Sequence, residues 1–203
     1  MKLSRILMIV GSLMLLFLFV FPMWVIRLEA PQYPIPLGMD IYVTRITGEE
    51  PNDLKNINIM NHYIGMAEIP ETIPEFAIFP AVIIFMVIFG VGAGLIGGPR
   101  WFLAWFILMS LLGIAGMVDF YIWEYNYGHS LDPKAIMSFA NPDGTPMTYQ
   151  PPLIGTKHIL NFTAHSYPKI AAYLLFLGMG MTLAAFFVGR REARKACETA
   201  ANT

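Results

Sequence analysis

The sequence predicts an all-α membrane protein with four transmembrane helices and two long outer segments that form a small cap. Three observations predict this class. Of the 203 residues, 56% are hydrophobic and only 13% are charged, which is too apolar for an ordinary soluble domain. Basic residues gather at one end of the predicted helices. The apolar residues form four blocks long enough to cross a bilayer, which takes about 20 helical residues: 6–26, 76–97, 101–123 and 170–189.

The first apolar block follows the basic residues Lys2 and Arg5, an arrangement that is also typical of a secretory signal peptide. Its apolar core runs for about 20 residues, longer than that of a usual signal. No small-residue cleavage site closes it before Arg27. We therefore expect residues 1–26 to form a retained first transmembrane helix.

The later blocks divide the rest of the chain. The second and third blocks are joined by the short turn Gly97-Gly98-Pro99-Arg100, so we expect a transmembrane helical hairpin over 76–123. Two long polar stretches flank this hairpin and are the expected outer segments. The predicted parts after the first helix are therefore outer segment one at 27–75, the hairpin at 76–123, outer segment two at 124–169, a fourth helix at 170–189 and a basic tail at 190–203.

Orientation follows from the basic residues, because Lys and Arg are enriched on the cytoplasmic side of a membrane. Lys2, Arg5 and Arg100 all fall on one side of the predicted arrangement, together with the basic cluster at 190–195. The sequence thus predicts a bacterial inner membrane protein with both termini cytoplasmic and a periplasmic cap. A single cysteine, Cys197, excludes an internal disulfide framework and a multi-cysteine metal site.

Each outer segment carries local structure signals. Alternation over residues 40–46 predicts a short strand in segment one. The turn-forming stretch 141–146 lies between Met137 and Met147 and predicts a hairpin or an ordered loop in segment two. Unstructured loops longer than about 15 residues are uncommon in compact proteins, so we expect the two segments to pack on each other.

All four histidines of the chain lie in or beside the outer segments, and they are candidate metal ligands. In the stretch NHYIGM, a helix would place His62 and Met66 on one face. His158 and His165 are seven residues apart and would share a face of a helix leading into the last span. Imidazole and thioether together favour copper, and thioether favours Cu(I). The sequence predicts a shared copper site of His62, Met66, His158 and His165.

The same residues also have ordinary structural interpretations. A histidine near a membrane surface often hydrogen-bonds a carbonyl or a carboxylate, and methionine is a flexible filler of apolar gaps. We expect NHYIGM to form a short helix with Asn61 near its start, where its side chain would cap an N–H group. Gly65 would then allow a close approach to segment two.

Other chemistry is sparse. Asp119 and Glu124 lie at the outer edge of the third apolar block, where ionisable side chains are candidate functional groups, and His129 follows them. A quinol site built from Asp119, Glu124 and an outer histidine is one hypothesis, and a simple pairing of Asp119 with a lysine is another. No phosphate-binding loop or nucleophile elbow is present. We expect no enzymatic activity and no nucleic-acid partner.

Two stretches, DLKNINIMNHYIGM and GTKHILNFTAHSYPK, resemble a family of small four-helix inner-membrane proteins encoded with nitrous oxide reductase and its copper-delivery factors. The resemblance lies in the two outer loops. It implies a non-enzymatic role in maturation of a periplasmic copper reductase, through copper handling or the docking of another membrane or periplasmic protein. A structural subunit of a respiratory membrane complex without its own metal, and a quinol-binding subunit, are the alternatives.

Overall fold

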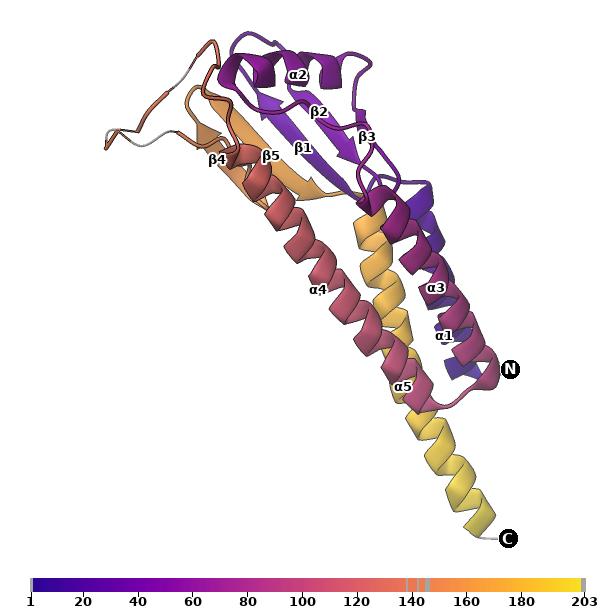
Figure 1. The fold of residues 1–203 in the computed structure, drawn as a ribbon. Helices are drawn as coiled ribbons and strands as arrows, with labels where there is room; N and C mark the ends of the chain where they lie inside the picture. Colours follow the sequence, from indigo (N-terminus) through magenta and orange to yellow (C-terminus); the bar gives the residue numbers. More distant parts are fainter. Residues whose placement is uncertain (1, 138, 142, 145–146, 202–203) are drawn as a thin grey trace.

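The computed structural model describes residues 2–137, 139–141, 143–144 and 147–201. A bundle of helices occupies one end of the molecule, and a β-sheet with one helix occupies the other, here called the sheet end (Figure 1). In chain order the elements are α1 (Leu3–Leu13), the 3₁₀ helix η1 (Met14–Phe19), β1 (Trp24–Glu29), β2 (Leu37–Ile41), β3 (Ile46–Gly48), α2 (Asp53–Ile64), α3 (Glu75–Ile96), α4 (Pro99–His129), β4 (Gly155–Ile159), β5 (Phe162–Pro168) and α5 (Ile170–Ala201).

The sheet is antiparallel and has five strands in the order β3-β2-β1-β5-β4. Its central strand β1 pairs with β2 on one side and with β5 on the other, so that Trp24 lies opposite both Ile41 and Pro168. Both outer segments therefore contribute to one sheet and do pack on each other. The expectation of an all-α fold is wrong, because the outer segments form strands as well as a helix.

The first apolar block is not one long helix. Helix α1 ends at Leu13, η1 ends at Phe19, and the chain then enters β1. Pro22 follows η1, and proline both lacks an N–H group and disfavours helix in the preceding residue. Residues 24–26, predicted as the end of a helix, are strand. The prediction of four long spans is met in part: in the described part of the chain, α3, α4 and α5 are long and apolar enough to cross a membrane, whereas Leu3–Phe19 is a shorter apolar helix.

Helix α1 packs closely in the bundle. A Cβ atom added at Gly11 would lie 2.7 Å from the carbonyl oxygen of Gly178 in α5, so the two backbones are in contact. The Ser4 hydroxyl donates to Glu192 of α5 at 2.6 Å. The Arg5 guanidinium donates to the carbonyl of Ile96 at the end of α3. Both chain termini lie at the end of the bundle away from the sheet, here called the terminal end (Figure 1).

The predicted strand at 40–46 is divided between two strands. Strand β2 ends at Ile41 and β3 begins at Ile46, and the Tyr42 N–H donates to the Arg45 carbonyl at 2.9 Å to close the turn. In segment two, part of the predicted turn (Pro142, Thr145 and Pro146) lies outside the described residues. Its described part is hydrogen-bonded, since the N–H of Gly144 donates to Asn141 and that of Met147 donates to Phe139.

The two faces of the sheet differ in character. The apolar face is defined by Trp24, Ile26 and Met39, which form a buried cluster with Ile57 of α2. The last turns of α4 also reach this face, where the Phe120 ring contacts Trp24 at 5.7 Å between centroids. The polar face is defined by side chains that alternate with these along the strands: Arg27, Glu29, Asp40, His158 and His165.

Candidate functional site

The structure places the predicted copper ligands in two groups on opposite faces of the sheet. His62 is in α2, on the side of the apolar face, and Met66 follows that helix. His165 in β5 lies opposite Arg27 in β1, and His158 in β4 lies opposite Thr163, two residues from His165. Both are strand residues on the polar face, so the expected helix before the last span is wrong. The four residues are not brought together.

The sequence NHYIGM forms the end of a helix. Asn61 is in the last turn of α2, where it is buried and donates to the Tyr127 hydroxyl at 2.7 Å. It does not cap the start of a helix as expected. Gly65 ends α2 in the left-handed conformation, with φ of 78°, and the Met66 N–H donates to the Asn61 carbonyl at 2.9 Å. This is a glycine-terminated helix end, which turns the residue after the glycine back toward the helix.

His62 and Met66 line one surface cavity of about 140 Å³. Segment two supplies the other wall of the cavity. The Asp132 N–H holds this wall against the end of α2 by donating to the Gly65 carbonyl at 2.8 Å. A Cβ atom at Gly65 would lie 2.8 Å from the Ala135 side chain. The expected close approach at this glycine is therefore confirmed. The lining residues are His62, Gly65, Met66, Asp132, Lys134, Ala135 and Ile136.

The donor set of this cavity suits a soft metal more than a hard one. It offers an imidazole, a thioether and the carboxylate of Asp132, and of these the first two are ligands that copper accepts. Lys134 lines the same cavity, and its N–H donates to Asp132 Oδ1 at 2.8 Å. Among the described residues, no three His, Cys, Asp or Glu side chains are grouped to hold a metal ion. A site with three ligands in this cavity would therefore include the thioether of Met66.

Met66 also has a packing role. Its side chain contacts the buried cluster of Tyr149, Ile159 and Ala164, which joins segment two to the apolar face of the sheet. It is half-buried, whereas His62 is exposed. Met66 thus matches the filler interpretation as well as the ligand interpretation.

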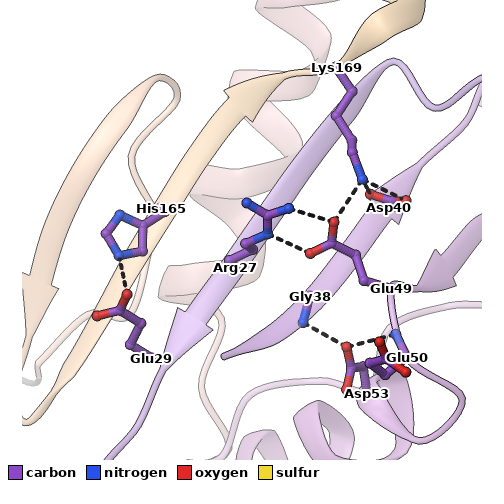
Figure 2. Close-up of polar contacts among 9 residues, drawn as sticks. All are labelled: Arg27, Glu29, Gly38, Asp40, Glu49, Glu50, Asp53, His165 and Lys169. Carbon is purple, nitrogen blue, oxygen red and sulfur yellow. Dashed lines mark hydrogen bonds and ion pairs between the residues drawn. The ribbon is translucent and has the colours of Figure 1, made fainter. Parts of the chain in front are cut away.

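The two histidines of the polar face are hydrogen-bonded to threonines. His165 Nδ1 lies 2.9 Å from Thr156 Oγ1, and His158 Nδ1 lies 3.0 Å from Thr163 Oγ1. His165 Nε2 is also 3.2 Å from Glu29 Oε1, an ion pair when the imidazole is protonated (Figure 2). These contacts match the structural interpretation, in which each histidine ring is held by a neighbouring polar group.

An ionic network crosses the polar face beside His165 (Figure 2). Arg27 binds Glu49 through two N–H groups, at 2.5 and 2.7 Å. Lys169 Nζ lies 2.7 Å from Glu49 and 2.7 Å from Asp40. The network links β1, β2 and the end of β3 to the residue that precedes α5. Sequence reasoning did not identify it, although charged residues that alternate with apolar ones in β1 and β2 were the available signal.

Hydrogen bonding shifts the titration of the network. The hydrogen bonds from Arg27 lower the pKa of Glu49 to about 2, against an opposing effect of burial, and Lys169 contributes in the same direction. For Lys169, burial acts to lower the pKa, but the hydrogen bonds to Asp40 and Glu49 outweigh it and raise the pKa. Glu49 and Lys169 are therefore each stabilised in the ionised form by their partners.

Gly38 and Asp53 position the acidic members of this region. A side chain at Gly38 would overlap Glu49, so the glycine leaves space for that carboxylate over β2. The buried Asp53 begins α2, and its Oδ2 accepts hydrogen bonds from the N–H groups of Gly38 and Glu50 (Figure 2). One carboxylate thus joins the start of α2 to β2.

The three candidates of α4 do not converge. Asp119, Glu124 and His129 are spaced by five residues, so each side chain is rotated about 140° around the helix from the previous one. Glu124 is fully buried, and neither carboxylate oxygen has a hydrogen-bond partner among the described residues. His129 hydrogen-bonds the Tyr125 carbonyl at 2.8 Å and stacks on its ring. α4 alone does not assemble the predicted quinol site.

A second, apolar cavity of about 90 Å³ lies between the sheet, α2 and the end of α4. Its lining is mostly apolar, and two of its polar groups are engaged, since Asn61 donates to Tyr127 and Tyr127 donates to the Ala67 carbonyl at 2.6 Å. The cavity that contains His62 and Met66 is therefore the candidate site. Comparison of the chain with known protein families, with curated proteins and with solved structures found no match.

Proposed function

We propose that the protein is a non-enzymatic accessory protein of a bacterial inner membrane that handles copper for a periplasmic copper reductase. The observation that carries this proposal is the surface cavity lined by His62 and Met66. An imidazole and a thioether at one accessible place form the donor pair that Cu(I) favours. The resemblance of the surrounding loop to proteins encoded with nitrous oxide reductase supports the same function.

The helices would hold this cavity at a membrane surface. α3, α4 and α5 are long and apolar enough to span a bilayer, and α1 with η1 rises roughly 28 Å at 1.5 Å per α-helical and 2.0 Å per 3₁₀ residue. Lys2, Arg5, Arg100 and the basic end of α5 lie at the terminal end. Basic residues favour the cytoplasmic side, which supports a periplasmic position for the sheet end.

The cavity suits exchange of the metal better than its retention. It holds two soft or borderline donors, and the cationic side chain of Lys134 opposes the binding of a cation. A site of this kind binds copper weakly and releases it to a partner with more ligands. Protons compete with the metal for the imidazole, so binding weakens as the pH is lowered.

Copper loading tests the proposal. The full-length protein in lipid nanodiscs is incubated with Cu(I) under anaerobic reducing conditions and desalted, and its copper content is measured by mass spectrometry. We expect binding by the unmodified protein and its loss in the double variant His62→Gln and Met66→Leu, where leucine preserves the apolar contacts of Met66. Lys134→Gln is expected to increase the affinity.

The matched control is the double variant His158→Gln and His165→Gln, which removes the two histidines on the opposite face of the sheet. It is expected to bind as much copper as the unmodified protein. Loss of copper in the control with retention in the first variant would move the site to the polar face. If the unmodified protein binds no copper, a docking or structural subunit without its own metal becomes the better description.

A further inference from the structure

Charge is strongly separated between the two ends of the molecule. Of the chain's 13 lysines and arginines, seven lie at the terminal end, together with only two of its 14 aspartates and glutamates. The net charge of −1 therefore hides a marked excess of basic residues at the terminal end and of acidic residues elsewhere. Four of the seven basic residues follow Gly189 in α5, and the other three are Lys2, Arg5 and Arg100.

Two helices bring basic residues to the same level of the bundle. A Cβ atom added at Gly189 of α5 would lie 3.3 Å from the Phe102 ring of α4, so these two residues mark one level. Arg190 is one residue beyond Gly189 toward the terminal end, and Arg100 is two residues beyond Phe102 in the same direction. At 1.5 Å per residue, the two arginines therefore lie within about one helical turn of each other along the bundle.

The basic residues of α5 lie on its outward side. Glu192 marks the inward side, because it accepts a hydrogen bond from the Ser4 hydroxyl of α1. At about 100° per residue, the four basic residues occupy about 140° of the helix circumference, and Glu192 falls outside this range. The last turns of α5 extend past the other described helices (Figure 1), so none of these covers them. The four residues are all exposed: Arg190, Arg191, Arg194 and Lys195.

These side chains lean back toward the apolar part of α5. In a helix each Cα–Cβ bond is tilted toward the N-terminus, and α5 begins at the sheet end, beyond its apolar stretch. Arg190 shows this lean, since its guanidinium carbon lies 5.6 Å from the ring centroid of Phe186, one turn earlier. A basic side chain placed just after an apolar stretch is thereby directed to the boundary between apolar and polar surroundings.

Most of this positive charge is not neutralised within the chain. Arg194 forms an exposed i,i+4 ion pair with Glu198, at 2.9 Å. Arg191 and Lys195 form no ion pair with any residue that the structure describes. Both side chains are therefore available to an anionic group from outside the chain.

We propose that the basic band, defined as Arg100, Arg190, Arg191, Arg194 and Lys195, binds the phosphate groups of anionic phospholipids in the cytoplasmic leaflet. The proposal rests on the membrane position proposed above for α3, α4 and α5. Clusters of basic residues directly cytoplasmic of a membrane-spanning helix attract anionic headgroups. The guanidinium group adds specificity, because it binds phosphate through two parallel hydrogen bonds.

The position and the charge of the basic band argue against other occupants. A symmetric dimer would place the same patch of two copies together, so two positively charged surfaces would face each other. A soluble acidic protein would meet side chains that lean away from it toward the membrane. Phospholipid headgroups lie where the side chains lean and carry the complementary charge.

Electron paramagnetic resonance of spin-labelled lipids tests the proposal. The full-length protein is reconstituted in phosphatidylcholine liposomes that contain a trace of phosphatidylglycerol or phosphatidylcholine, each with a nitroxide on its acyl chain. The spectrum separates lipids held at the protein surface from free lipids, and the two probes give a relative association constant. We expect phosphatidylglycerol to associate roughly threefold more strongly at low salt, with the preference falling toward one in about 1 M salt.

Matched double variants locate the effect. Arg191→Gln with Lys195→Gln removes the two basic residues that have no ion pair and should reduce the preference by about half. Lys55→Gln with Lys157→Gln is the control, because it removes two exposed positive charges at the sheet end and changes the net charge equally. The control should keep the preference of the unmodified protein.

The possible outcomes separate the lipid preference from the membrane position. Equal association of the two lipids, with both held at the protein surface, would overturn the proposal and leave the membrane position intact. Absence of any held lipid would overturn both. An equal loss of preference in the two double variants would show an effect of net charge alone and would also overturn the assignment to the basic band.

Discussion

Glu49 is the residue that joins the polar face of the sheet together. It accepts hydrogen bonds from Arg27 of β1 and from Lys169, which precedes α5. These three side chains are far apart in the chain, yet they meet over the position where Gly38 has no side chain. The network is balanced in charge when Asp40 is included, and it joins the sheet to the residue that precedes α5.

The first prediction concerns the pH dependence of this residue. The pKa of Glu49 falls from its ordinary 4.5 to about 2 in the folded protein. A lowered pKa stabilises the folded state above pH 4.5, and this contribution is lost as the pH falls toward 2. Glu49→Gln should lower the unfolding free energy at pH 7 by about 1 kcal/mol, a modest value because Arg27 is half-exposed.

Chemical unfolding followed by circular dichroism in detergent, between pH 2 and pH 7, measures this effect. The difference between the unmodified protein and Glu49→Gln should shrink steadily below pH 4.5. Glu198→Gln is the control, because the ion pair of Glu198 with Arg194 on the same helix is exposed. A constant difference over the whole pH range would contradict the prediction.

The second prediction concerns Glu124. Its carboxyl group is fully buried and has no hydrogen-bond partner in the described part of the chain, and such a group opposes folding. Glu124→Leu should therefore raise the unfolding free energy by about 1 to 2 kcal/mol. Thermal unfolding in detergent measures it, with the exposed Glu71→Leu as a control that should change little. A loss of stability would show that the carboxyl group makes a stabilising contact.

At the scale of elements, the end of α2 decides where His62 and Met66 lie. Gly65 combines a positive φ with contact against segment two, whereas Gly144 has a positive φ and open space around it. Substitution of these two glycines therefore distinguishes the free-energy cost of a left-handed backbone conformation from the cost of steric overlap between an added Cβ atom and segment two.

The third prediction uses this pair. Gly144→Ala should cost about 1 kcal/mol, from the left-handed conformation alone. Gly65→Ala should cost about 3 kcal/mol, because its Cβ atom also overlaps the wall formed by Asp132 and Ala135. Chemical unfolding measures both, and copper loading of the surviving folded Gly65→Ala protein should fall because the cavity wall moves. An equal loss of unfolding free energy in the two variants would contradict the prediction, because it would show that segment two shifts to accept the added Cβ atom at little cost.

At the scale of the whole molecule, the fold separates two ends. The sheet end is built from both outer segments, and the terminal end holds both chain termini and the basic tail (Figure 1). If the helices span a membrane as proposed, these two ends lie on opposite sides of it.

The fourth prediction tests this sidedness. Cys197 is exposed at the terminal end, and Lys157 in β4 is exposed at the sheet end. In intact cells, a membrane-impermeant thiol reagent should not label Cys197, but it should label Lys157→Cys in a Cys197→Ser background. Labelling after the membrane is opened confirms that Cys197 is reactive. Labelling of Cys197 in intact cells would reverse the predicted orientation.

The long helices could be predicted from the sequence because a continuous apolar stretch of about 20 residues is a local signal that needs no knowledge of distant contacts. The predicted blocks 76–97, 101–123 and 170–189 lie almost wholly within α3, α4 and α5. The latter two helices continue beyond the apolar blocks, so hydropathy found the helices but not their ends. The helical turn at NHYIGM was also predicted, because it depends on local residues, and so was the close approach at Gly65, because glycine has no side chain to prevent it.

The sheet and the grouping of the histidines were decided only by the tertiary structure. Trp24 and Pro168 are paired across the sheet, and no local pattern reveals a pairing over such a separation. Residues 24–26 are as apolar as the helix before them, so hydropathy could not show that they form a strand. The spacing of His158 and His165 is as compatible with one face of a helix as with the two paired strands in which they lie. Long-range strand pairing placed them instead across the sheet from His62 and Met66.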